Sequence, residues 1–511
     1  MLSQIDSSAI LGIDAYIVRV EVDISSSMPM FTIVGLPDAA VQESRERVRS
    51  AIKNTGLDFP LRRITINLAP ADIKKQGPAF DLPIAVGILA ATGQVRTERI
   101  SEGMFVGELA LDGAVSPVSG VLSMAIKARA DKRPYLVVPE ANAREAAIVG
   151  DVNVYAVRSL ADVVVLLNDF DAQTPLTVDP DTLLYQGSGD DLDFCEVKGQ
   201  EHVKRALEVA AAGGHNILLV GPPGSGKTML ARRVPSILPP LTLEESLDVT
   251  KIYSVGGLLG THKALVTRRP FRSPHHSISN AALAGGGSTP RPGEVSLAHN
   301  GILFLDELPE FKRDVLEVLR QPLEDGHVTI ARIAATMTYP ARLMLVAAMN
   351  PCPCGYYGDT VKTCSCSPPT IAKYLQRISG PLLDRIDIHI EVPRLRQDEM
   401  IQGGGSGEPS LSIRGRVLSA RERQKARFDK TNLHCNAHMG ARQIKQFCHV
   451  TDDVKDLLRA AISQLGLSAR AYDRILKLSR TIADLDAQED VQLAHVAEAI
   501  QYRALDRKLW G

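Results

Sequence analysis

Apolar and polar positions alternate differently along the chain, and the pattern predicts regions of different structure. The first 170 residues contain β-branched runs typical of strands, interspersed with helix-like stretches at 41–54 and 81–93. The strand candidates in this region are residues 15–22, 31–34, 63–68 and 135–138. This mixture of strands and helices predicts an α/β or α+β domain over residues 1–170.

Two breaks in composition divide the rest of the chain. Pro, Gly and acidic residues gather at 169–191, which is typical of a linker, and we place the linker at residues 171–191. A flexible joint is predicted at Gln402–Gly407, where the sequence is QGGGSG. A central domain is therefore expected over residues 192–395 and a C-terminal domain over residues 396–511.

The C-terminal domain is predicted to be helical. From Thr451 onward, Leu, Ile and Ala recur at helical spacing. Residues 414–430 hold seven Lys or Arg against two acidic residues and few strand formers, so we expect a basic helix there. Charge runs are usually solvated faces or subunit contacts, and we favour that interpretation over a contact with DNA.

Composition narrows the class of protein. The 58 Lys+Arg and 59 Asp+Glu give a net charge of −1, which argues against a wholly basic nucleic-acid binder but permits a basic channel. The 45% apolar and 23% charged fractions exclude disorder as the main character. No run approaches the ~18 apolar residues of a membrane helix, and the first residues lack a signal-peptide pattern. Seven Cys make no disulfide framework, so we expect a cytoplasmic protein.

The strongest motif is HNILLVGPPGSGKTML, in which an apolar run at 217–220 leads into a glycine-rich loop and a predicted helix. Its G-x-x-x-x-G-K-[ST] pattern predicts a loop whose backbone N–H groups bind phosphates. Lys227 would reach the β- and γ-phosphates, and Thr228 would offer its hydroxyl to Mg²⁺. A chance glycine-rich turn is the alternative. We therefore expect ATP to bind at Gly221, Pro222, Pro223, Gly224, Ser225, Gly226, Lys227 and Thr228.

Two further apolar strands are predicted to end in polar side chains. Residues 302–305 lead into Asp306 and Glu307, a pair suited to holding the metal ion and to polarising the attacking water, respectively. Residues 342–349 lead to Asn350, which would lie beside the γ-phosphate if its strand lies between the other two. Taken alone, an Asn at a strand end is more often a turn residue.

Four cysteines form a separate cluster with the spacing C-x-C-x9-C-x-C, within fifteen residues. Four thiolates so close together in a cytosolic protein suit one tetrahedral Zn²⁺. The C-x-C spacing is tighter than the usual C-x2-C, and reduced free thiols or a labile disulfide pair are the alternatives. The predicted zinc ligands are Cys352, Cys354, Cys364 and Cys366.

These residues resemble a known family. The P-loop, the Asp306–Glu307 strand and Asn350 resemble the AAA+ ATPase core, and the runs RPGEVSLAHNGILFLDELPEF and AAMNPCPCG resemble its magnesium-chelatase-like ComM/YifB branch. The resemblance implies a Lon-protease-like N-terminal α/β domain, a central αβα sandwich and a C-terminal helical lid. It also implies a hexameric ring ATPase and, in naturally competent bacteria, a helicase that drives branch migration on single-stranded and branched DNA.

Two arginines gain roles from the resemblance. In GPLLDRID, Arg385 matches the arginine finger that such rings insert into the neighbouring subunit's ATP site. In LSARAYDR, Arg470 matches the sensor-2 arginine, which would contact the γ-phosphate from the same subunit; Arg474 is its rival. A surface or lid salt bridge is the alternative for each of them.

The resemblance also suggests where DNA would bind. Residues 254–300 resemble an insert that faces the ring pore, and residues 328–339 resemble a pore hairpin, with Arg332 as its pore residue, although an ordinary hairpin would have the same pattern. The neighbouring His275 and His276 are not expected to bind a metal, because adjacent side chains point in different directions. The arginines of the insert that would meet phosphates are Arg268, Arg269, Arg272 and Arg291.

In the N-terminal domain, the runs GPAFDLPIAVGILAATG and PVSGVLSMAIKARA resemble the Lon-protease-type domain. The positions of that family's Ser–Lys dyad are occupied here by Ala79 and Leu122, which can be neither a nucleophile nor a base. Proteolysis is therefore not expected, and the domain would serve as a DNA-binding or assembly collar. Basic residues that permit DNA binding are Arg62, Arg63, Lys74 and Lys75.

Three functions are compatible with these residues. The first is an ATP-driven DNA translocase, which the ATP motifs, the trans arginine and the pore insert favour. The second is the ATPase motor subunit of a magnesium-chelatase-like or protein-remodelling complex; the fused Lon-like domain opposes a chelatase. The third is a scaffold that binds nucleotide without turnover, and the intact Asp306, Glu307 and Arg385 argue against it.

Overall fold

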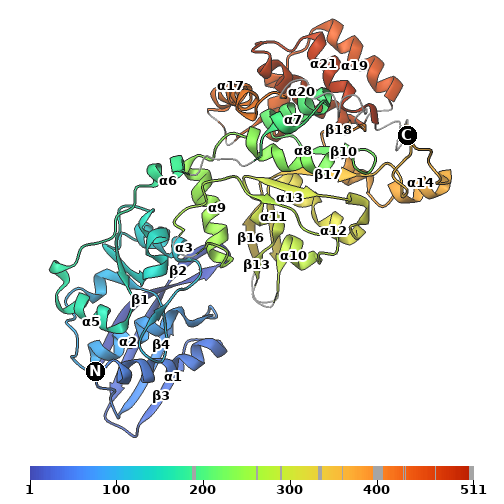
Figure 1. Ribbon diagram of the computed structural model, residues 1–511. Coiled ribbons are helices and arrows are strands. Elements are labelled where there is room, and N and C mark those ends of the chain that lie inside the picture. The colour runs from blue at the N-terminus through green and yellow to red at the C-terminus, as the bar shows by residue number, and fades with distance from the viewer. Residues whose placement is uncertain are drawn as a thin grey trace. The chain divides into compact units, whose positions relative to one another are not determined.

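The computed structural model describes residues 1–186, 192–260, 263–287, 290–331, 336–359, 361–394, 407–429, 431, 433–465 and 468–505 (Figure 1). Contacts divide the chain into two compact units. The first contains Met1–Gly187, Thr242–Thr267 and Ala331–Tyr339, and the second contains Ser188–Leu241, Arg268–Ile330 and Pro340–Gly511. Residues 242–267, which the composition breaks leave inside the central domain, therefore group with the N-terminal part of the chain.

The first unit is built on a seven-stranded mixed sheet in the order β3-β4-β2-β1-β5-β8-β9. The predicted strands and helices of this region are confirmed, whereas β1, β5 and β9 were not expected. The strands are β1 (Leu2–Leu11), β2 (Asp14–Ser25), β3 (Met30–Val34), β4 (Arg63–Ala69), β5 (Gly103–Phe105), β8 (Tyr135–Pro139) and β9 (Asn153–Val157).

Helices cover both faces of this sheet. Successive residues of a strand point to opposite faces, and in β8 Tyr135 and Val137 join one buried cluster while Leu136 and Val138 join the other. The first cluster includes residues of α1 (Ala39–Asn54), α2 (Asp81–Ala91) and α5 (Leu160–Asn168). The second includes residues of α3 (Val121–Ala130) and α4 (Glu140–Ala147), and α9 (Leu243–Val255) also packs on α3.

The second unit is built on a five-stranded sheet in the order β11-β14-β17-β10-β18, and all of its neighbouring strands are parallel. Because both faces are covered, its central strands are continuous apolar runs, as predicted for 217–220, 302–305 and most of 342–349. The strands are β10 (Ile217–Val220), β11 (Phe271–Arg272), β14 (Ile302–Leu305), β17 (Met344–Met349) and β18 (Ile388–Glu391).

The C-terminal helices share one hydrophobic core with this sheet. Val417, Ile475 and Leu478 belong to the same buried cluster as Ile217 and Val346. In Figure 1 these helices gather around α7 (Glu201–Gly213), against which two of them pack. The helices are α17 (Ser410–Phe428), α18 (Ala441–Phe447), α19 (Asp452–Leu465), α20 (Ala469–Leu485) and α21 (Leu493–Gln501).

The basic stretch at 414–430 lies largely in α17, so the predicted helix is confirmed. Several of its arginines form hydrogen bonds or ion pairs with other residues of the second unit. Arg414 donates to the carbonyl of Ser236 at 2.7 Å, and Arg421 donates to that of Ala211 at 2.9 Å. Arg427 forms a two-pronged ion pair with the buried Asp484. These arginines fasten α17 to its surroundings rather than forming a solvated face.

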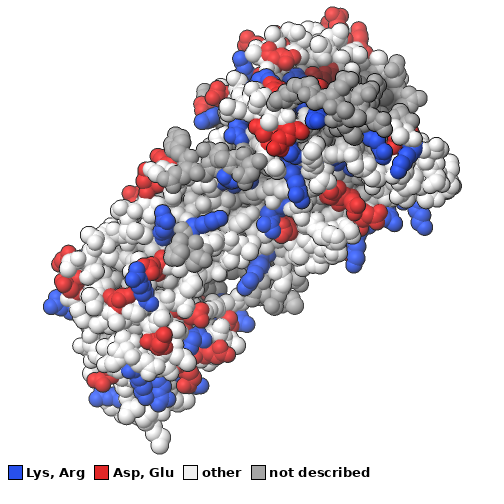
Figure 2. Space-filling view, in the orientation of Figure 1, with Lys and Arg blue, Asp and Glu red and all other residues white. Residues whose placement is uncertain are grey.

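Charge is distributed evenly on the surface in view. Figure 2 shows basic and acidic side chains interspersed over the described residues of that face, in keeping with the near-equal totals in the sequence. Within the described part of the chain, none of the helices combines the length and the apolar character needed to cross a bilayer.

Candidate nucleotide site

The glycine-rich loop connects the carboxyl end of β10 to α8 (Lys227–Arg233). Gly224 and Gly226 have φ angles of 75° and 91°, in the left-handed region that favours glycine. Gly221 is required for a different reason, since a β-carbon there would lie 2.2 Å from the carbonyl oxygen of Val392. The sequence pattern of the loop is thus the one that its backbone geometry demands.

Lys227 is buried at the centre of this loop. Its Nζ donates to the carbonyl oxygens of Gly221 and Pro222 at 2.7 and 3.0 Å, and to Oδ1 of Asn350 at 3.2 Å. Burial lowers the pKa of Lys227 to about 8, although Asp306 and Glu307 act in the opposite direction. The end of β17 and the P-loop therefore meet at one ammonium group.

Thr228 and Asp306 lie together at the same edge of the sheet. Thr228 Oγ1 donates to Asp306 Oδ2 at 2.7 Å, and Oδ1 of that carboxylate accepts from the backbone N–H of Glu307 at 2.9 Å. Hydroxyl and carboxylate oxygens are ligands that Mg²⁺ prefers. The donor set fits a magnesium ion that would be shared with a bound triphosphate.

Glu307 follows Asp306 with a φ of 53°, which is unusual for a residue with a side chain. Its carboxylate is half exposed and lies 3.8 Å from Nδ1 of His276. The ring of His276 lies against that of His275, with centroids 4.0 Å apart and planes tilted by 35°. Sequence reasoning missed the contact with Glu307 because the preceding strand, β11, has only two residues and was not recognised.

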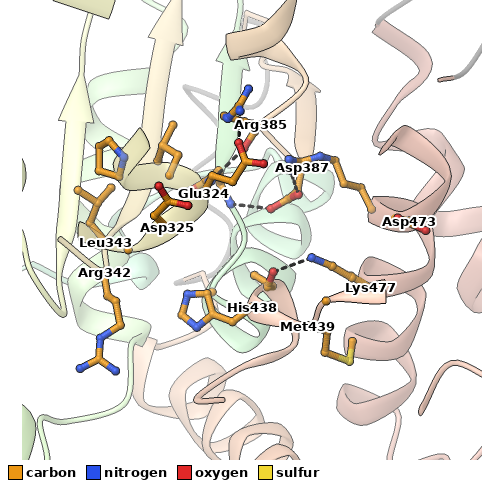
Figure 3. A pocket seen from close by; sticks show the side chains of 18 of the residues that line it. Glu324, Asp325, Arg342, Leu343, Arg385, Asp387, His438, Met439, Asp473 and Lys477 are labelled. Atoms are coloured by element: carbon orange, nitrogen blue, oxygen red, sulfur yellow. Dashed lines mark hydrogen bonds and ion pairs between the residues drawn. The ribbon is translucent and has the colours of Figure 1, made fainter. Parts of the chain in front are cut away.

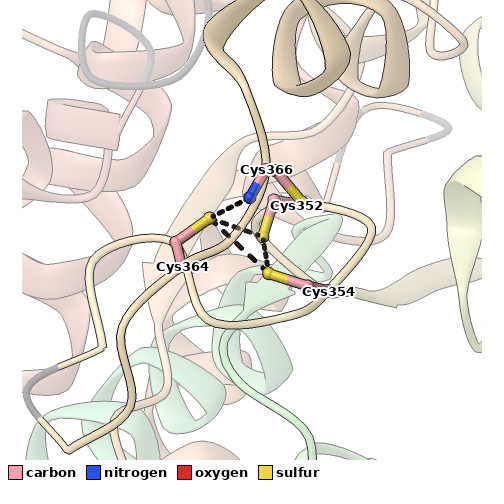
Figure 4. Close-up of side chains that lie close together, drawn as sticks. All are labelled: Cys352, Cys354, Cys364 and Cys366. Carbon is pink, nitrogen blue, oxygen red and sulfur yellow. Dashed lines mark hydrogen bonds between the residues drawn. The ribbon is translucent and has the colours of Figure 1, made fainter.

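The four cysteines converge in the loop that follows Asn350, as Figure 4 shows. Cys352, Cys354 and Cys364 have Sγ–Sγ distances of 3.3, 3.5 and 3.7 Å, and all four sulfurs lie within 4.8 Å of one another. Tetrahedral Zn–S bonds of ~2.3 Å place sulfurs about 3.8 Å apart. The cluster is therefore compatible with Zn²⁺, and none of its thiols is in a disulfide.

The cysteine loop also touches the P-loop directly. At Gly355, between the two cysteine pairs, a β-carbon would come within 2.5 Å of Cδ of Pro223. Gly355 has a φ of 85°, so both its backbone and the close approach favour glycine. The cysteine cluster and the nucleotide loop are packed against each other.

A cavity of about 480 Å³ lies at the opposite edge of the same sheet. Asn216, Arg342 and Asp387 line it, and each lies just before the first residue of β10, β17 or β18. Because these strands are parallel, the cavity is at their amino ends. A strand of four residues such as β10 separates the two edges by about 13 Å at ~3.3 Å per residue.

The predicted arginines lie at this amino edge and not at the P-loop. Arg385, Arg470 and Arg474 all line the cavity. The expectation that Arg470 contacts the γ-phosphate of its own subunit is therefore wrong, because packing of α20 on α17 and α7 holds it at the other edge of the sheet. For Arg385, the same position keeps it away from the P-loop of its own chain.

The ion pairs around the cavity distinguish these arginines. Figure 3 shows Arg385 and Glu324 facing each other, and the two form an ion pair. Arg474 forms an ion pair with the buried Asp387. Burial raises the pKa of the Asp387 carboxyl, but Arg474 and His215 together hold that pKa well below its usual range. Arg470 is exposed and forms no ion pair with any described residue.

Several candidate DNA contacts have structural roles instead. Arg269 donates to the carbonyl oxygens of Pro239 and Asn300, both at 2.6 Å, and Arg272 forms a two-pronged ion pair with Glu294. The guanidinium groups of these two arginines therefore hold neighbouring loops, and their contact with phosphates stays a prediction.

Arg268 and Arg291, the other two candidate phosphate contacts of the insert, are exposed. The hairpin expected at 328–339 is confirmed as β15 (His327–Ala331) and β16 (Thr336–Pro340), which form a two-stranded sheet, but Arg332 lies outside the described residues.

In the first unit, the positions of the missing dyad lie in ordinary structural settings. Ala79 is in a single 3-10 turn, and Leu122 is fully buried in α3. Lys75 is also fully buried; its Nζ donates to the carbonyl of Ile73 at 2.8 Å, and burial lowers its pKa. Lys75 is therefore not available to DNA, contrary to expectation.

The parallel sheet, with a P-loop, Asp306 and Asn350 at the carboxyl ends of its adjacent strands, defines an AAA+-like α/β domain. Family comparisons agree with this class. Residues 193–400 match the family described as magnesium chelatase, subunit ChlI. Residues 20–142 match subunit ChlI of Mg-chelatase, and residues 407–503 match the magnesium chelatase subunit ChlI C-terminal family.

Full-length relatives narrow the class further. The chain is 46% identical to "Competence protein ComM" of Haemophilus influenzae over 511 residues, covering 99% of this chain and 98% of that protein. It is 44% identical to YifB of Escherichia coli over 509 residues, with coverage of 99% and 98%. Magnesium-chelatase subunit ChlI of Pyropia yezoensis is 22% identical over 318 residues, covering 57% of this chain and 76% of that protein. The chain belongs to the ComM/YifB family of magnesium-chelatase-like proteins.

The lowered pKa of Lys227 predicts that ATP affinity falls as pH rises above about 8. Above that pH the free protein carries a neutral amine, so binding of the triphosphate must take up a proton, and the dissociation constant should rise by up to about tenfold per pH unit. Isothermal titration of the wild-type protein with a non-hydrolysable ATP analogue measures this, because Glu307, which raises the pKa of Lys227, then stays in place. The Lys227→Arg variant stays protonated and should bind independently of pH; a wild-type affinity that is equally independent would contradict the prediction.

Proposed function

We propose that this chain is the subunit of a ring-forming ATPase that moves along DNA and promotes branch migration during recombination in natural transformation. The observation that carries the proposal is the placement of two complementary edges on one sheet. The carboxyl edge holds Lys227, Thr228, Asp306 and Asn350, and the amino edge holds the arginine cavity. A head-to-tail arrangement of subunits, closing into a hexamer, would bring unlike edges together.

At the carboxyl edge, each residue has a distinct task. The backbone of Gly221–Gly226 and the ammonium of Lys227 bind phosphate oxygens, and Thr228 and Asp306 hold Mg²⁺, which supplies charge neutralisation on those oxygens when bound. Glu307 orients and polarises the attacking water, and the side chain of Asn350, already bonded to Lys227, lies at the γ-phosphate position. These are the parts that phosphoryl transfer to water requires.

At the amino edge, Arg385 and Arg470 act on the nucleotide of the neighbouring subunit. Their guanidinium groups are separated from the P-loop of their own chain by the length of the strands. Arg470 has no ion-pair partner among the described residues, whereas Arg474 is bound to Asp387. We therefore assign the γ-phosphate role to Arg470, now in trans, and the structural role to Arg474.

The remaining parts of the proposal rest on the family. The N-terminal unit is a Lon-like domain without a proteolytic dyad, and the C-terminal helices form the lid of the ATPase. Full-length similarity to a competence protein supports an action on single-stranded and branched DNA. The exposed Arg268 and Arg291 and the β15–β16 hairpin are the candidate contacts.

A second candidate function is the motor subunit of a magnesium-chelatase-like or protein-remodelling complex. The matched families, all described by a chelatase subunit, favour it. The relative named as that subunit covers 57% of this chain, whereas the competence protein covers 99%. Stimulation by DNA distinguishes the two candidates.

The first test is ATP hydrolysis with and without single-stranded and forked DNA. We expect DNA to stimulate turnover several-fold, and the Glu307→Gln variant to lose at least 100-fold, because it can still bind ATP but no longer polarises water. Turnover that is indifferent to DNA at every salt concentration would favour the chelatase-like candidate. Wild-type protein that is silent under all conditions would oppose ATPase function.

Mixing two inactive variants tests the trans arginine. Lys227→Ala removes a subunit's own ATP site, and Arg385→Ala removes the finger that it donates, so each variant alone should be inactive. In an equal mixture, about a quarter of the interfaces would join an intact P-loop to an intact finger, and activity should return. A mixture as inactive as its components would place Arg385 outside the neighbouring site.

We also propose that the cysteine cluster holds a structural Zn²⁺. We expect about one zinc per chain in the purified protein by atomic emission, and a loss of most of it in the Cys354→Ser variant, because three thiolates leave the tetrahedron incomplete. Cys195→Ser is the matched control, since Cys195 lies outside the cluster. Metal-free wild-type protein from zinc-supplemented cells would contradict the assignment.

A further inference from the structure

A second cavity, of about 110 Å³, adjoins the P-loop at the carboxyl ends of β10 and β18. It shares two residues of the P-loop, so a nucleotide with its phosphates on that loop has its base within reach of the cavity. The other wall comes from the cysteine loop and from the segment after β18. The residues that matter for its chemistry are Gly221, Pro222, Tyr357, Asp359 and Arg394.

Asp359 is the unusual group in this wall. Its side chain is 3% exposed. One carboxylate oxygen, Oδ1, accepts from the backbone N–H of Val361 at 2.9 Å. The other, Oδ2, is buried and accepts no hydrogen bond from any described residue; its nearest cation, Arg394, is 3.6 Å away. A buried carboxylate oxygen without a donor is costly, which indicates that a ligand supplies one.

Arg394, which faces Asp359, also has a buried polar atom without a hydrogen-bond partner among the described residues. Its Nε is buried and donates to no described residue, and its guanidinium lies 5.9 Å from the ring of Tyr356. The charges of Asp359 and Arg394 are therefore close enough to attract each other but not to satisfy each other's hydrogen bonds. Polar groups of a planar ring inserted beside them would complete both.

We propose that Asp359 selects adenine by accepting a hydrogen bond from the 6-amino group of ATP at Oδ2. The inference rests on the proposed ATPase function and adds the base specificity of that site. Adenine carries a donor at position 6, whereas guanine and hypoxanthine carry an acceptor oxygen there, which a carboxylate repels. Pro222 and Tyr357 supply the apolar surfaces against which the base lies.

The cysteine cluster holds Asp359 in this position. Asp359 lies between Cys354 and Cys364, whose sulfurs are 3.5 Å apart, so the segment that carries it is closed into a loop. Within that loop the N–H of Asp359 donates to the carbonyl of Tyr356 at 3.1 Å. A group whose backbone and Oδ1 are both fixed presents Oδ2 in one direction, which is what discrimination between bases requires.

The test compares ATP with inosine triphosphate (ITP), which differs mainly in having an oxygen at position 6. Dissociation constants are measured by isothermal titration in the Glu307→Gln background, so that turnover plays no part. We expect Asp359-intact protein to bind ATP at least tenfold more tightly than ITP, since sites that bond a substrate N–H discriminate strongly.

The Asp359→Asn variant tests the hydrogen bond to the base more directly than the comparison of ATP with ITP in Asp359-intact protein. Its Oδ1 can still accept from the N–H of Val361, so the new amide N–H points where Oδ2 lay, and it would donate to the 6-oxygen of ITP. We expect ATP binding to weaken about tenfold or more and the ATP/ITP preference to invert. Asp456→Asn removes the same charge from an exposed position on α19 and should leave the preference unchanged.

The results that would contradict base recognition differ from those that would contradict the proposed ATPase function. Equal affinity for ATP and ITP in Asp359-intact protein, or an equal loss for both nucleotides in Asp359→Asn, would overturn base recognition while leaving the ATP site in place. Failure of Asp359-intact protein to bind either triphosphate would overturn the proposed ATPase function as well.

Discussion

The parallel direction of five short strands is the constraint on which the second unit depends. Each strand begins at one edge of the sheet and ends at the other, so residues that precede strands cannot meet residues that follow them. Lys227, Asp306 and Asn350 follow strands, whereas Arg342 and Asp387 precede them. The three central strands, β10, β14 and β17, are buried along their whole length, which makes the separation a rigid one. Under the proposed function, this separation makes hydrolysis depend on a neighbouring subunit.

The sequence predicted the site correctly where a functional residue follows a continuously apolar strand. β10, β14 and β17 have four to six buried residues each, and their positions brought Thr228, Asp306 and Asn350 to one edge. Sequence reasoning failed for β11, whose two residues carry no periodicity, and with it missed the approach of His276 to Glu307. The cysteine spacing was sufficient to predict the cluster, because C-x-C pairs need only one loop closure to converge.

Long-range packing accounts for the remaining errors. Arg470 was placed in its own subunit's ATP site because a motif fixes a residue's neighbours in sequence but not the partner on which its helix packs. Arg269 and Arg272 were expected to meet phosphates because their segment resembles a pore-facing insert, yet Arg269 donates to the carbonyl of Asn300 and Arg272 pairs with Glu294. Lys75 was named because its charge permits DNA binding, yet its side chain is buried. The grouping of residues 242–267 with the first unit likewise results from the packing of α9 on α3, which neither composition nor periodicity reveals.

The cysteine loop combines a feature that the sequence predicted, the thiol cluster, with one that only the structure shows, its packing on the P-loop. The described part of residues 351–367 contains no helix or strand and few buried apolar side chains, so neither backbone ladders nor a hydrophobic core can fix its shape. Yet it begins at Asn350, packs on Pro223 through Gly355 and carries Asp359. Under the proposal that the cluster holds Zn²⁺, four thiolates bound to one ion would supply the rigidity that this loop otherwise lacks. The cluster is then part of the support of the nucleotide site, because the same loop packs on Pro223 and carries Asp359.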